Sequence, residues 1–261
     1  MSRSAKDKVP KDGIVSKVSN VLIEIYTLYN PTFDTSGDTS GTFDTFPTFW
    51  YYTYMTIYFV RHGESVNNIA RNYQGADVPL SELGQRQASI VAERLKHVSF
   101  DVILASSFTR AHDTAKTIQA VTGKPIEVLD SLVERRRPSA FHNKPYDDPE
   151  LEKLRHFLDT HPDPQNHHSD EENFFDIKKR VQEVLQILEN RSEENIVVVS
   201  HGVFIKMAIM LIILKDTLRI EQFADSFHSI SINNTAISIC TFNKDHGWRV
   251  KTVNDFAHLA E

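Results

Sequence analysis

The segment IYFVRHGESVNN, residues 57–68, joins a short apolar run directly to a group of polar side chains. Its first four residues are β-branched or aromatic, which is typical of a buried strand. The run ends at Arg61, His62 and Gly63. Because ligands of open α/β sheets bind just beyond the carboxyl ends of the strands, a cation, an imidazole and a flexible glycine suit a phosphate group there. A basic surface loop is the alternative interpretation of these three residues alone.

The composition argues against a nucleic-acid-binding protein and against a membrane protein. The chain has 261 residues, 40% hydrophobic and 25% charged, with a formal net charge of −6. An acidic chain without a basic block gives no reason to expect nucleic acid or an anionic membrane as a partner. The longest apolar run, 203–214, is shorter than the roughly 18 residues of a membrane span and contains Lys206, so it predicts a buried helix. No secretory signal is evident, and we expect a cytoplasmic protein.

The single cysteine, Cys240, lies in an alternating apolar run. One cysteine excludes an internal disulfide and fits a reducing compartment. The surrounding pattern predicts a thiol in the core rather than a nucleophile.

The first 54 residues differ in character from the rest. Residues 32–49 repeat Thr, Phe, Asp, Ser and Gly without helical or strand periodicity, which indicates a low-complexity segment. Met55 stands just before the first convincing strand. We therefore expect a functional domain at 55–261, with 1–54 a low-complexity or disordered extension outside the functional protein. An ordered appendage that packs on the domain is the alternative.

From Met55 onward, strand and helix patterns alternate along the chain. A continuous apolar run at 195–199 indicates a strand at the centre of a parallel sheet. The last two strands read as a hairpin. This alternation predicts an α/β protein, a three-layer α/β/α arrangement with a mostly parallel central sheet. The expected strands are 57–60, 100–105, 125–129, 195–199, 236–242 and 248–253, and the expected helices begin near 82 and cover 109–121, 151–158, 174–188 and the residues after 202.

Two of the predicted parallel strands end in a histidine followed by glycine, at His62 and at His201. Parallel strands bring both imidazoles to one edge of the sheet. Arg61 arrives with the first histidine, and Arg110 lies in the first turn of the helix after the second strand. Guanidinium groups match phosphoryl oxygens with paired hydrogen bonds, and a neutral imidazole is a competent nucleophile. The pattern predicts an anion site.

These residues carry a resemblance to a known family. The motifs are RHGES at 61–65 with Asn68, QG at 74–75, PLSELGQRQA at 79–88, SSFTRA at 106–111 and SHG at 200–202. In this order they resemble the histidine phosphatase superfamily, the phosphoglycerate mutase-like proteins. The resemblance extends from about residue 57 to the C-terminus.

The resemblance implies roles for individual residues. His62 would be the nucleophile that forms a phosphohistidine, and Glu134 would donate a proton to the leaving oxygen. An ion pair between Glu134 and the arginines after it is the alternative. The implied catalytic residues also include Arg61, Arg110 and His201, and the implied phosphate-binding residues are Arg61, Asn68, Gln74, Gly75, Arg110, His201 and Gly202.

Such a site requires no metal and no cofactor, because arginines and histidines supply the positive charge. The pair His167 and His168 stands beside acids but in a polar loop, which favours a solvated loop over a metal site. The partner that we expect is a small phosphorylated substrate. The sequence names neither that substrate nor an oligomeric state.

The choice between phosphatase and mutase depends on the residues after Glu134. Mutases of the family resemble one another in a Glu-Arg-His-Tyr-Gly run, whereas this chain has ERRRPS at 134–139. This departure favours a phosphomonoester hydrolase over a cofactor-dependent phosphoglycerate mutase. The three arginines would either recognise a second anionic group or form a solvated basic face. Residues 135–175 would form a lid that sets specificity, and a non-catalytic module that binds a phosphorylated ligand remains a third interpretation.

Overall fold

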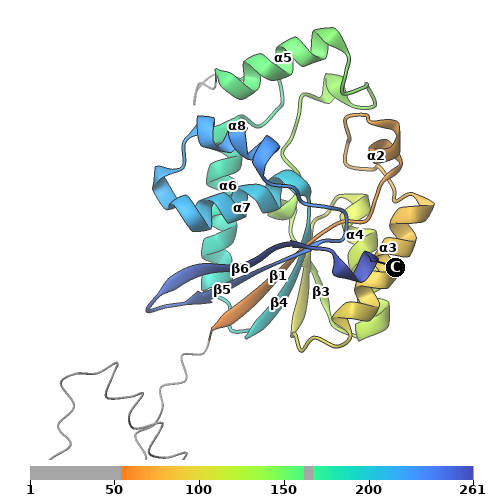
Figure 1. Cartoon of the computed structure of the whole chain (residues 1–261), viewed down its shortest axis with the longest axis vertical. Coiled ribbons are helices and arrows are strands. Elements are labelled where there is room, and N and C mark those ends of the chain that lie inside the picture. Colours follow the sequence, from red (N-terminus) through yellow and green to blue (C-terminus); the bar gives the residue numbers. More distant parts are fainter. Residues whose placement is uncertain (1–53, 162–166, 261) are drawn as a thin grey trace, which may run out of the picture. The chain divides into compact units, whose positions relative to one another are not determined.

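The computed structural model describes residues 54–161 and 167–260, so the expectation for 1–54 lies almost entirely outside the described residues. The described chain forms a six-stranded sheet with helices on both faces (Figure 1). The strands are β1 (Met55–Arg61), β2 (Val102–Ala105), β3 (Ile126–Val128), β4 (Asn195–Ser200), β5 (Ile237–Asn243) and β6 (Gly247–Asp255). The helices are α2 (Val66–Ala70), α3 (Glu82–Leu95), α4 (Thr109–Thr122), α5 (Pro149–Thr160), α6 (Phe174–Glu189), α7 (Gly202–Leu214) and α8 (Ile220–Ser229), with short 3₁₀ turns at Asp130–Leu132, Ser139–Phe141, Lys215–Thr217 and Ala257–Leu259.

The sheet is mostly parallel. Its strand order is β3-β2-β4-β1-β5-β6. β3, β2, β4 and β1 run parallel, whereas β5 pairs antiparallel with β1 and with β6. β4 lies between two parallel neighbours, as its uninterrupted apolar run predicted. The predicted three-layer α/β fold and the terminal hairpin are confirmed.

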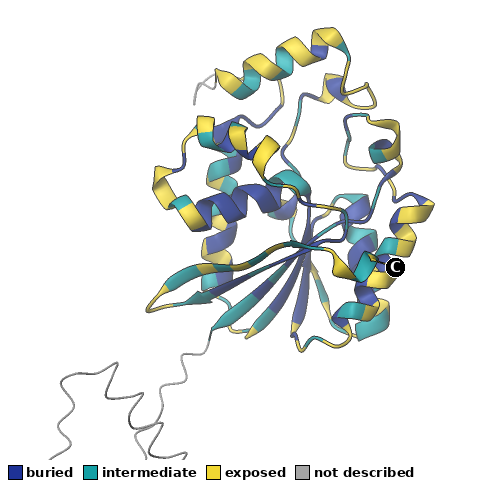
Figure 2. Cartoon of the chain, in the orientation of Figure 1, coloured by how far each residue is buried: buried dark blue, intermediate teal, exposed yellow. Residues whose placement is uncertain are grey.

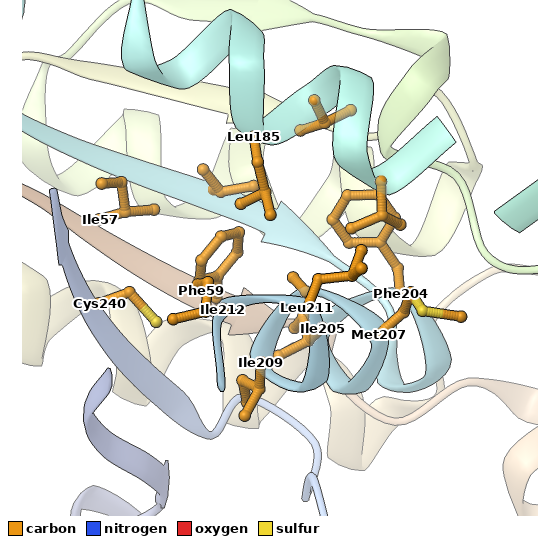
Figure 3. Close-up of a cluster of buried hydrophobic side chains, with 14 of the residues drawn as sticks. Ile57, Phe59, Leu185, Phe204, Ile205, Met207, Ile209, Leu211, Ile212 and Cys240 are labelled. Carbon is orange, nitrogen blue, oxygen red and sulfur yellow. The ribbon is translucent and has the colours of Figure 1, made fainter. Parts of the chain in front are cut away.

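Successive side chains of the strands point to opposite faces of the sheet and pack into two separate hydrophobic cores. Ile57 and Phe59 of β1 face the layer of α6 and α7, whereas Val60 faces the layer of α3 and α4. This alternation follows from the period of two in an extended strand. Figure 3 shows the first of these cores, where side chains of α7 pack over β1 and against Leu185 of α6. Full burial of each such side chain contributes about 1.5–3 kcal/mol relative to exposure.

The predicted buried helix is α7. Residues 204–212 are all buried, and the burial colouring in Figure 2 shows α7 as a largely buried element. Among the described residues, no helix is both long enough and apolar enough to cross a membrane. Cys240 of β5 is fully buried, and burial raises the pKa of its thiol to about 12. The predicted core thiol is confirmed.

Helix ends follow local sequence signals. Ser81 accepts a hydrogen bond from Gly84 N and caps α3, and Gly123 ends α4 with a left-handed φ of 69°. The helix predicted near 151–158 is α5, which begins after the capping Asp148. The sequence prediction omitted α2 and α8. α2 has five residues, too few for a periodic pattern, and a capping box between Ser65 and Asn68 stabilises it.

The loop after β1 is pressed against the start of α3. A Cβ atom on Gly63 would lie 2.4 Å from Gly84 O, and a Cβ atom on Gly84 would lie 1.9 Å from Glu64 O. Real Cβ atoms do not approach a backbone oxygen so closely. Both positions therefore require glycine, and their contact fixes the backbone that follows Arg61 and His62.

Candidate active site

A cavity of about 470 Å³ opens beside the carboxyl ends of β1 and β4. Six cationic side chains and one carboxylate are among its walls, so its charge is strongly positive. Its lining residues are Arg61, His62, Asn68, Tyr73, Gln74, Arg110, Glu134, Arg135, Arg137, Tyr146, Arg155, Gly202, Val203, Lys206, Phe227 and Ile232.

His62 is held in one orientation. Its Nδ1 lies 2.6 Å from the carbonyl oxygen of Gly63, which can only accept, so Nδ1 carries the proton. Nε2 is then the unprotonated nitrogen, and Arg110 Nε donates to it over 3.3 Å. Burial, then Arg110 and Arg61, lower the pKa of His62 well below its usual range, although the Gly63 carbonyl opposes this shift. His62 is therefore a neutral imidazole whose Nε2 lone pair accepts a hydrogen bond from Arg110.

The second histidine lies beside the first. The ring centroids of His62 and His201 are 5.1 Å apart. Ser106 Oγ accepts from Phe108 N and lies 2.8 Å from His201 Nε2. In the tautomer in which the hydroxyl donates to Nε2, the ring proton sits on Nδ1. His201 Nδ1 is buried and has no hydrogen-bond partner among the described residues. A buried donor without a partner is costly, and a phosphoryl oxygen would satisfy it.

The two arginines that the sequence predicted converge on the cavity from different elements. Arg61 ends β1, and its Nη1 donates to Ile232 O over 2.6 Å. Arg110 lies in the first turn of α4, where its Nη1 donates to Gly75 O over 2.8 Å. Arg61 Nε is buried without a partner among the described residues. Each guanidinium is thus fixed through one edge and keeps donors for an anion.

Residues 232–236 support the end of β1. Asn234 Nδ2 donates to His62 O over 2.9 Å, and Thr235 N donates to Arg61 O over 3.0 Å. Thr235 is fully buried with a left-handed φ of 56°. That conformation costs a β-branched residue about 1–2 kcal/mol, and the packing around it holds it in place. The backbone of Arg61 and His62 is therefore fixed on the β5 side as well.

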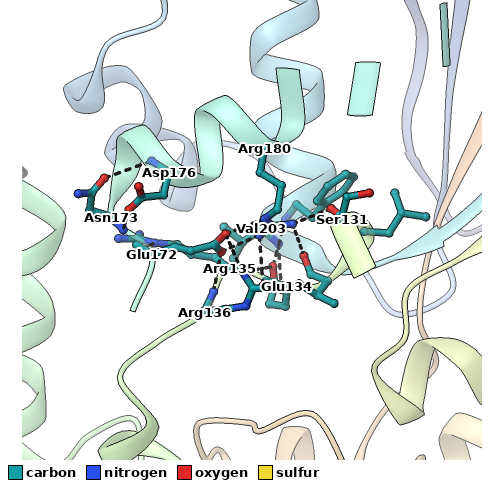
Figure 4. A network of polar contacts seen from close by, with 12 residues as sticks. Ser131, Glu134, Arg135, Arg136, Glu172, Asn173, Asp176, Arg180 and Val203 are labelled. Atoms are coloured by element: carbon teal, nitrogen blue, oxygen red, sulfur yellow. Dashed lines mark hydrogen bonds and ion pairs between the residues drawn. The ribbon is translucent and has the colours of Figure 1, made fainter. Parts of the chain in front are cut away.

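Glu134 lies at the N-terminus of α7. Its Oε2 accepts from Val203 N and its Oε1 from Phe204 N, both over 3.1 Å. Oε1 also accepts from Arg135 N over 2.9 Å. The first amides of a helix have no intrahelical partner and carry the positive end of its dipole, so they hold a carboxyl group in place there. Glu134 thus lines the cavity in a fixed position (Figure 4).

Of the three arginines after Glu134, Arg135 and Arg137 are largely withdrawn from solvent, whereas Arg136 is exposed. Arg135 is 6% exposed, and its Nη1 donates to Asp159 Oδ1 over 2.7 Å. Arg137 donates to both oxygens of the same carboxylate, over 2.9 and 3.2 Å. Arg136 pairs with Glu172, which Arg180 also binds (Figure 4). The arginines are therefore held by ion pairs within residues 135–175, the segment that the sequence predicted as a lid.

The remaining predicted residues divide into two groups. Asn68, Gln74 and Gly202 line the cavity, whereas Gly75 and His201 do not. Gly75 contacts Arg110 through its carbonyl oxygen. His167 pairs with Asp176 over 2.7 Å, and no group of three or more His, Cys, Asp or Glu within the described ranges could hold a metal ion.

Several lining residues were not singled out from the sequence as site residues. Tyr73, Tyr146 and Arg155 come from irregular or lid segments that have no motif. Lys206 did have a signal, because it is the only charged residue in the apolar run 203–214. Burial of a charged side chain costs free energy unless the side chain reaches a polar environment, so a lysine in an apolar helix indicates that the helix borders a polar cavity.

Comparison with known proteins identifies the family of this chain. A protein-family model, "Histidine phosphatase superfamily (branch 1)", matches residues 57–256. A protein named probable phosphoglycerate mutase GpmB, from Yersinia pestis, is 28% identical over 217 residues, which cover 78% of this chain and 95% of that protein.

Two solved structures are also similar. YhfR of Bacillus stearothermophilus is 27% identical with a TM-score of 0.66, over 78% of this chain and 98% of that one. A mutant phosphoserine phosphatase of Entamoeba histolytica, in complex with phosphoserine, is 25% identical with a TM-score of 0.61, over 78% and 99%. The match along most of the chain and the shared fold lead to one conclusion: this chain belongs to branch 1 of the histidine phosphatase superfamily.

Proposed function

We propose that the protein is a metal-independent phosphomonoester hydrolase that acts through a phosphohistidine on His62. One observation carries the proposal above the others. A neutral imidazole, with its Nδ1 proton held by Gly63 O and its Nε2 facing Arg110 Nε, lies close to two arginines and a second histidine. This arrangement suits nucleophilic attack on a phosphoryl group.

In the first step, His62 Nε2 attacks phosphorus in line with the leaving oxygen. A P–N bond forms, the P–O bond to the leaving group breaks, and Glu134 donates its proton to the leaving oxygen. Arg61 and Arg110 donate hydrogen bonds to the phosphoryl oxygens, with His201 Nδ1–H as a further donor. Charge stabilisation of this kind supplies most of the catalysis in phosphoryl transfer.

In the second step, water attacks the phosphohistidine, and the P–N bond breaks. Glu134, now a carboxylate, accepts a proton from that water, which restores the acid for the next turnover. Inorganic phosphate leaves, and His62 returns to its neutral form. The cycle balances without a metal ion, because the positively charged arginines offset the negative charge of the phosphoryl group, as a metal ion would otherwise do.

A mutase is the second candidate, and the similarity to a protein named as a phosphoglycerate mutase favours it. In that case the phosphoryl group would return from His62 to a sugar acid. The residues ERRRPS at 134–139 favour the hydrolase, because they depart from the run that mutases share. Both candidates use His62 and differ only in the acceptor.

The test is hydrolysis of p-nitrophenyl phosphate by the full chain, in the presence of a chelator. We expect His62→Ala to lower kcat by more than about 10³-fold while the unfolding temperature stays near that of the wild type. His97→Ala, at an exposed position after α3, is the matched control and should retain activity. Activity that survives in His62→Ala, or that the chelator removes, would contradict the proposal. Phosphoglycerate mutase activity without release of inorganic phosphate would select the second candidate.

A further inference from the structure

Lys206 is a largely buried lysine in the cavity wall, and its ammonium group has no ion-pair partner among the described residues. It lies on α7, four residues after Gly202 and three after Val203, so the three residues share one face of the helix. All three line the cavity. Lys206 is 7% exposed and forms no hydrogen bond and no ion pair with any described residue.

The ammonium group of Lys206 lies over an aromatic ring. Lys206 Nζ lies 4.5 Å from the ring centroid of Phe227, on α8. Burial lowers the pKa of Lys206 to about 8, Glu134 opposes this shift, and Arg61 adds to it. A contact with an aromatic ring offsets only part of the cost of removing an ammonium group from water.

The other cations of the cavity differ in this respect. Arg135 and Arg137 share the Asp159 carboxylate at 2.7 and 2.9 Å, and Arg155 lies 4.0 Å from it. In the proposed reaction, Arg61 and Arg110 bind the transferring phosphoryl group. Among the described cations that line the cavity, Lys206 differs from the five arginines. It has no carboxylate partner and no role in the proposed phosphoryl transfer.

The position of Lys206 indicates which part of a substrate it would meet. Lys206 lies one turn of α7 after Val203, whose amide donates to Glu134 Oε2 over 3.1 Å. Glu134 is the proposed donor to the leaving oxygen, so Lys206 stands on the side of the leaving group. Apolar side chains of Phe227 and Ile232 line the same cavity. An ion pair formed beside such a wall is stronger than one in water.

We propose that Lys206 binds a second negatively charged group on the leaving-group part of the substrate. The substrate class is therefore a small phosphomonoester that also carries a carboxylate or a second phosphate. This inference rests on the proposed function, since it takes the position of the phosphoryl group from His62 and its arginines. Lys206 selects among substrates and takes no part in the chemistry.

The test compares two pairs of phosphomonoesters, and the members of each pair differ by one anionic group. 3-Phosphoglycerate and glycerol 3-phosphate differ by a carboxylate, and fructose 1,6-bisphosphate and fructose 6-phosphate differ by a phosphate. Their dissociation constants are measured by calorimetry on the full chain carrying His62→Ala, which prevents turnover. Binding is thus measured independently of catalysis, while p-nitrophenyl phosphate hydrolysis by the wild type tests the proposed function separately.

We expect at least one ligand with the second anionic group to bind about 10- to 100-fold more tightly than the ligand that lacks it, which is the contribution of a hydrogen bond to a charged group. Lys206→Met should remove that ratio, and Lys206→Arg should retain most of it. Lys124→Met, which removes a lysine that lies over Phe100, is the matched control and should keep the ratio. The pair that responds identifies the second group as carboxylate or phosphate.

Two results would overturn the inference. One is a ratio below about threefold for both pairs in the protein with Lys206 intact, or no measurable binding of either anionic ligand. The other is a ratio that Lys206→Met leaves unchanged while thermal unfolding shows a folded protein. The second result would reduce Lys206 to a structural contact with Phe227.

Discussion

Asp159 of α5 joins the lid segment to the arginines beside Glu134. Its Oδ1 accepts from Arg135 Nη1 and Arg137 Nη1, over 2.7 and 2.9 Å. Substitution of Asp159 by Asn keeps the shape of the side chain and removes its charge. Arg135, 6% exposed, then loses its charged partner: it keeps the hydrogen bond from its Nε to Glu172 O, and the Asn oxygen can accept only a neutral hydrogen bond from it.

The magnitude follows from this geometry. Loss of one partner from a buried ion pair costs about 3–5 kcal/mol, because the other charge stays buried without compensation. The side chain of Asp159 is 17% exposed and Arg135 keeps one acceptor, so we expect the lower end, about 3 kcal/mol. For a domain of this size, that loss lowers Tm by about 6–12 °C.

The effect of Asp159→Asn should depend on pH. Burial alone would raise the pKa of Asp159, but Arg137 and Arg135 hold it below its usual value. A carboxyl group with a lowered folded pKa stabilises the protein above its unfolded pKa of about 3.9, and this contribution is lost as pH falls through the folded pKa. The difference in stability between wild type and variant should therefore be constant from pH 5 to 8 and narrow below about pH 4.

The assay is thermal unfolding followed by circular dichroism at several pH values. Glu150→Gln is the matched control, because it removes a carboxylate from an exposed pair with Lys153 on the same helix. We expect that control to shift Tm by less than about 1 °C. A Tm for Asp159→Asn within 2 °C of the wild type at pH 7 would refute the assignment of a stabilising role to this ion pair.

Three further predictions follow from particular residues. Gly84→Ala should destabilise the protein by about 3 kcal/mol in denaturant unfolding, because its Cβ would lie 1.9 Å from Glu64 O; unchanged stability would mean that the loop after β1 yields freely. Cys240 should not react with a maleimide in the native protein and should react after unfolding, since the thiol is fully buried; rapid native labelling would contradict that position. Glu134→Gln should lower kcat by about 10²–10⁴-fold for alkyl phosphates, whose leaving oxygens need a proton, and less for p-nitrophenyl phosphate; equal losses would exclude Glu134 as the proton donor.

The residues nearest the phosphoryl site could be predicted because the chain fixes them locally. Arg61 ends β1, and His62 and His201 follow directly after two adjacent parallel strands. Parallel pairing alone then places both imidazoles at one edge of the sheet. Arg110 follows in the same way from its place in the first turn of α4. No knowledge of distant contacts was needed for this part of the site.

The part of the cavity wall that we assign to the leaving group could not be predicted from the local sequence. Arg135 pairs with Asp159, 24 residues away, and the sequence left this arginine as either an anion receptor or a solvated charge. Phe227 approaches Lys206 through the packing of α8, a helix that the sequence prediction omitted. Such contacts depend on how separate elements pack, and the pattern of a single segment does not contain that information.

The central claim is that His62 carries the phosphoryl group, and the most direct test is to detect it there. The full chain is mixed with a phosphomonoester, quenched within milliseconds in base, and digested for mass spectrometry under conditions that preserve phosphohistidine. The account predicts one phosphoryl group on the peptide that contains His62, labile to acid and absent from His62→Ala. Turnover of the same substrate with no phosphorylated intermediate, or with the phosphoryl group on another residue, would contradict it.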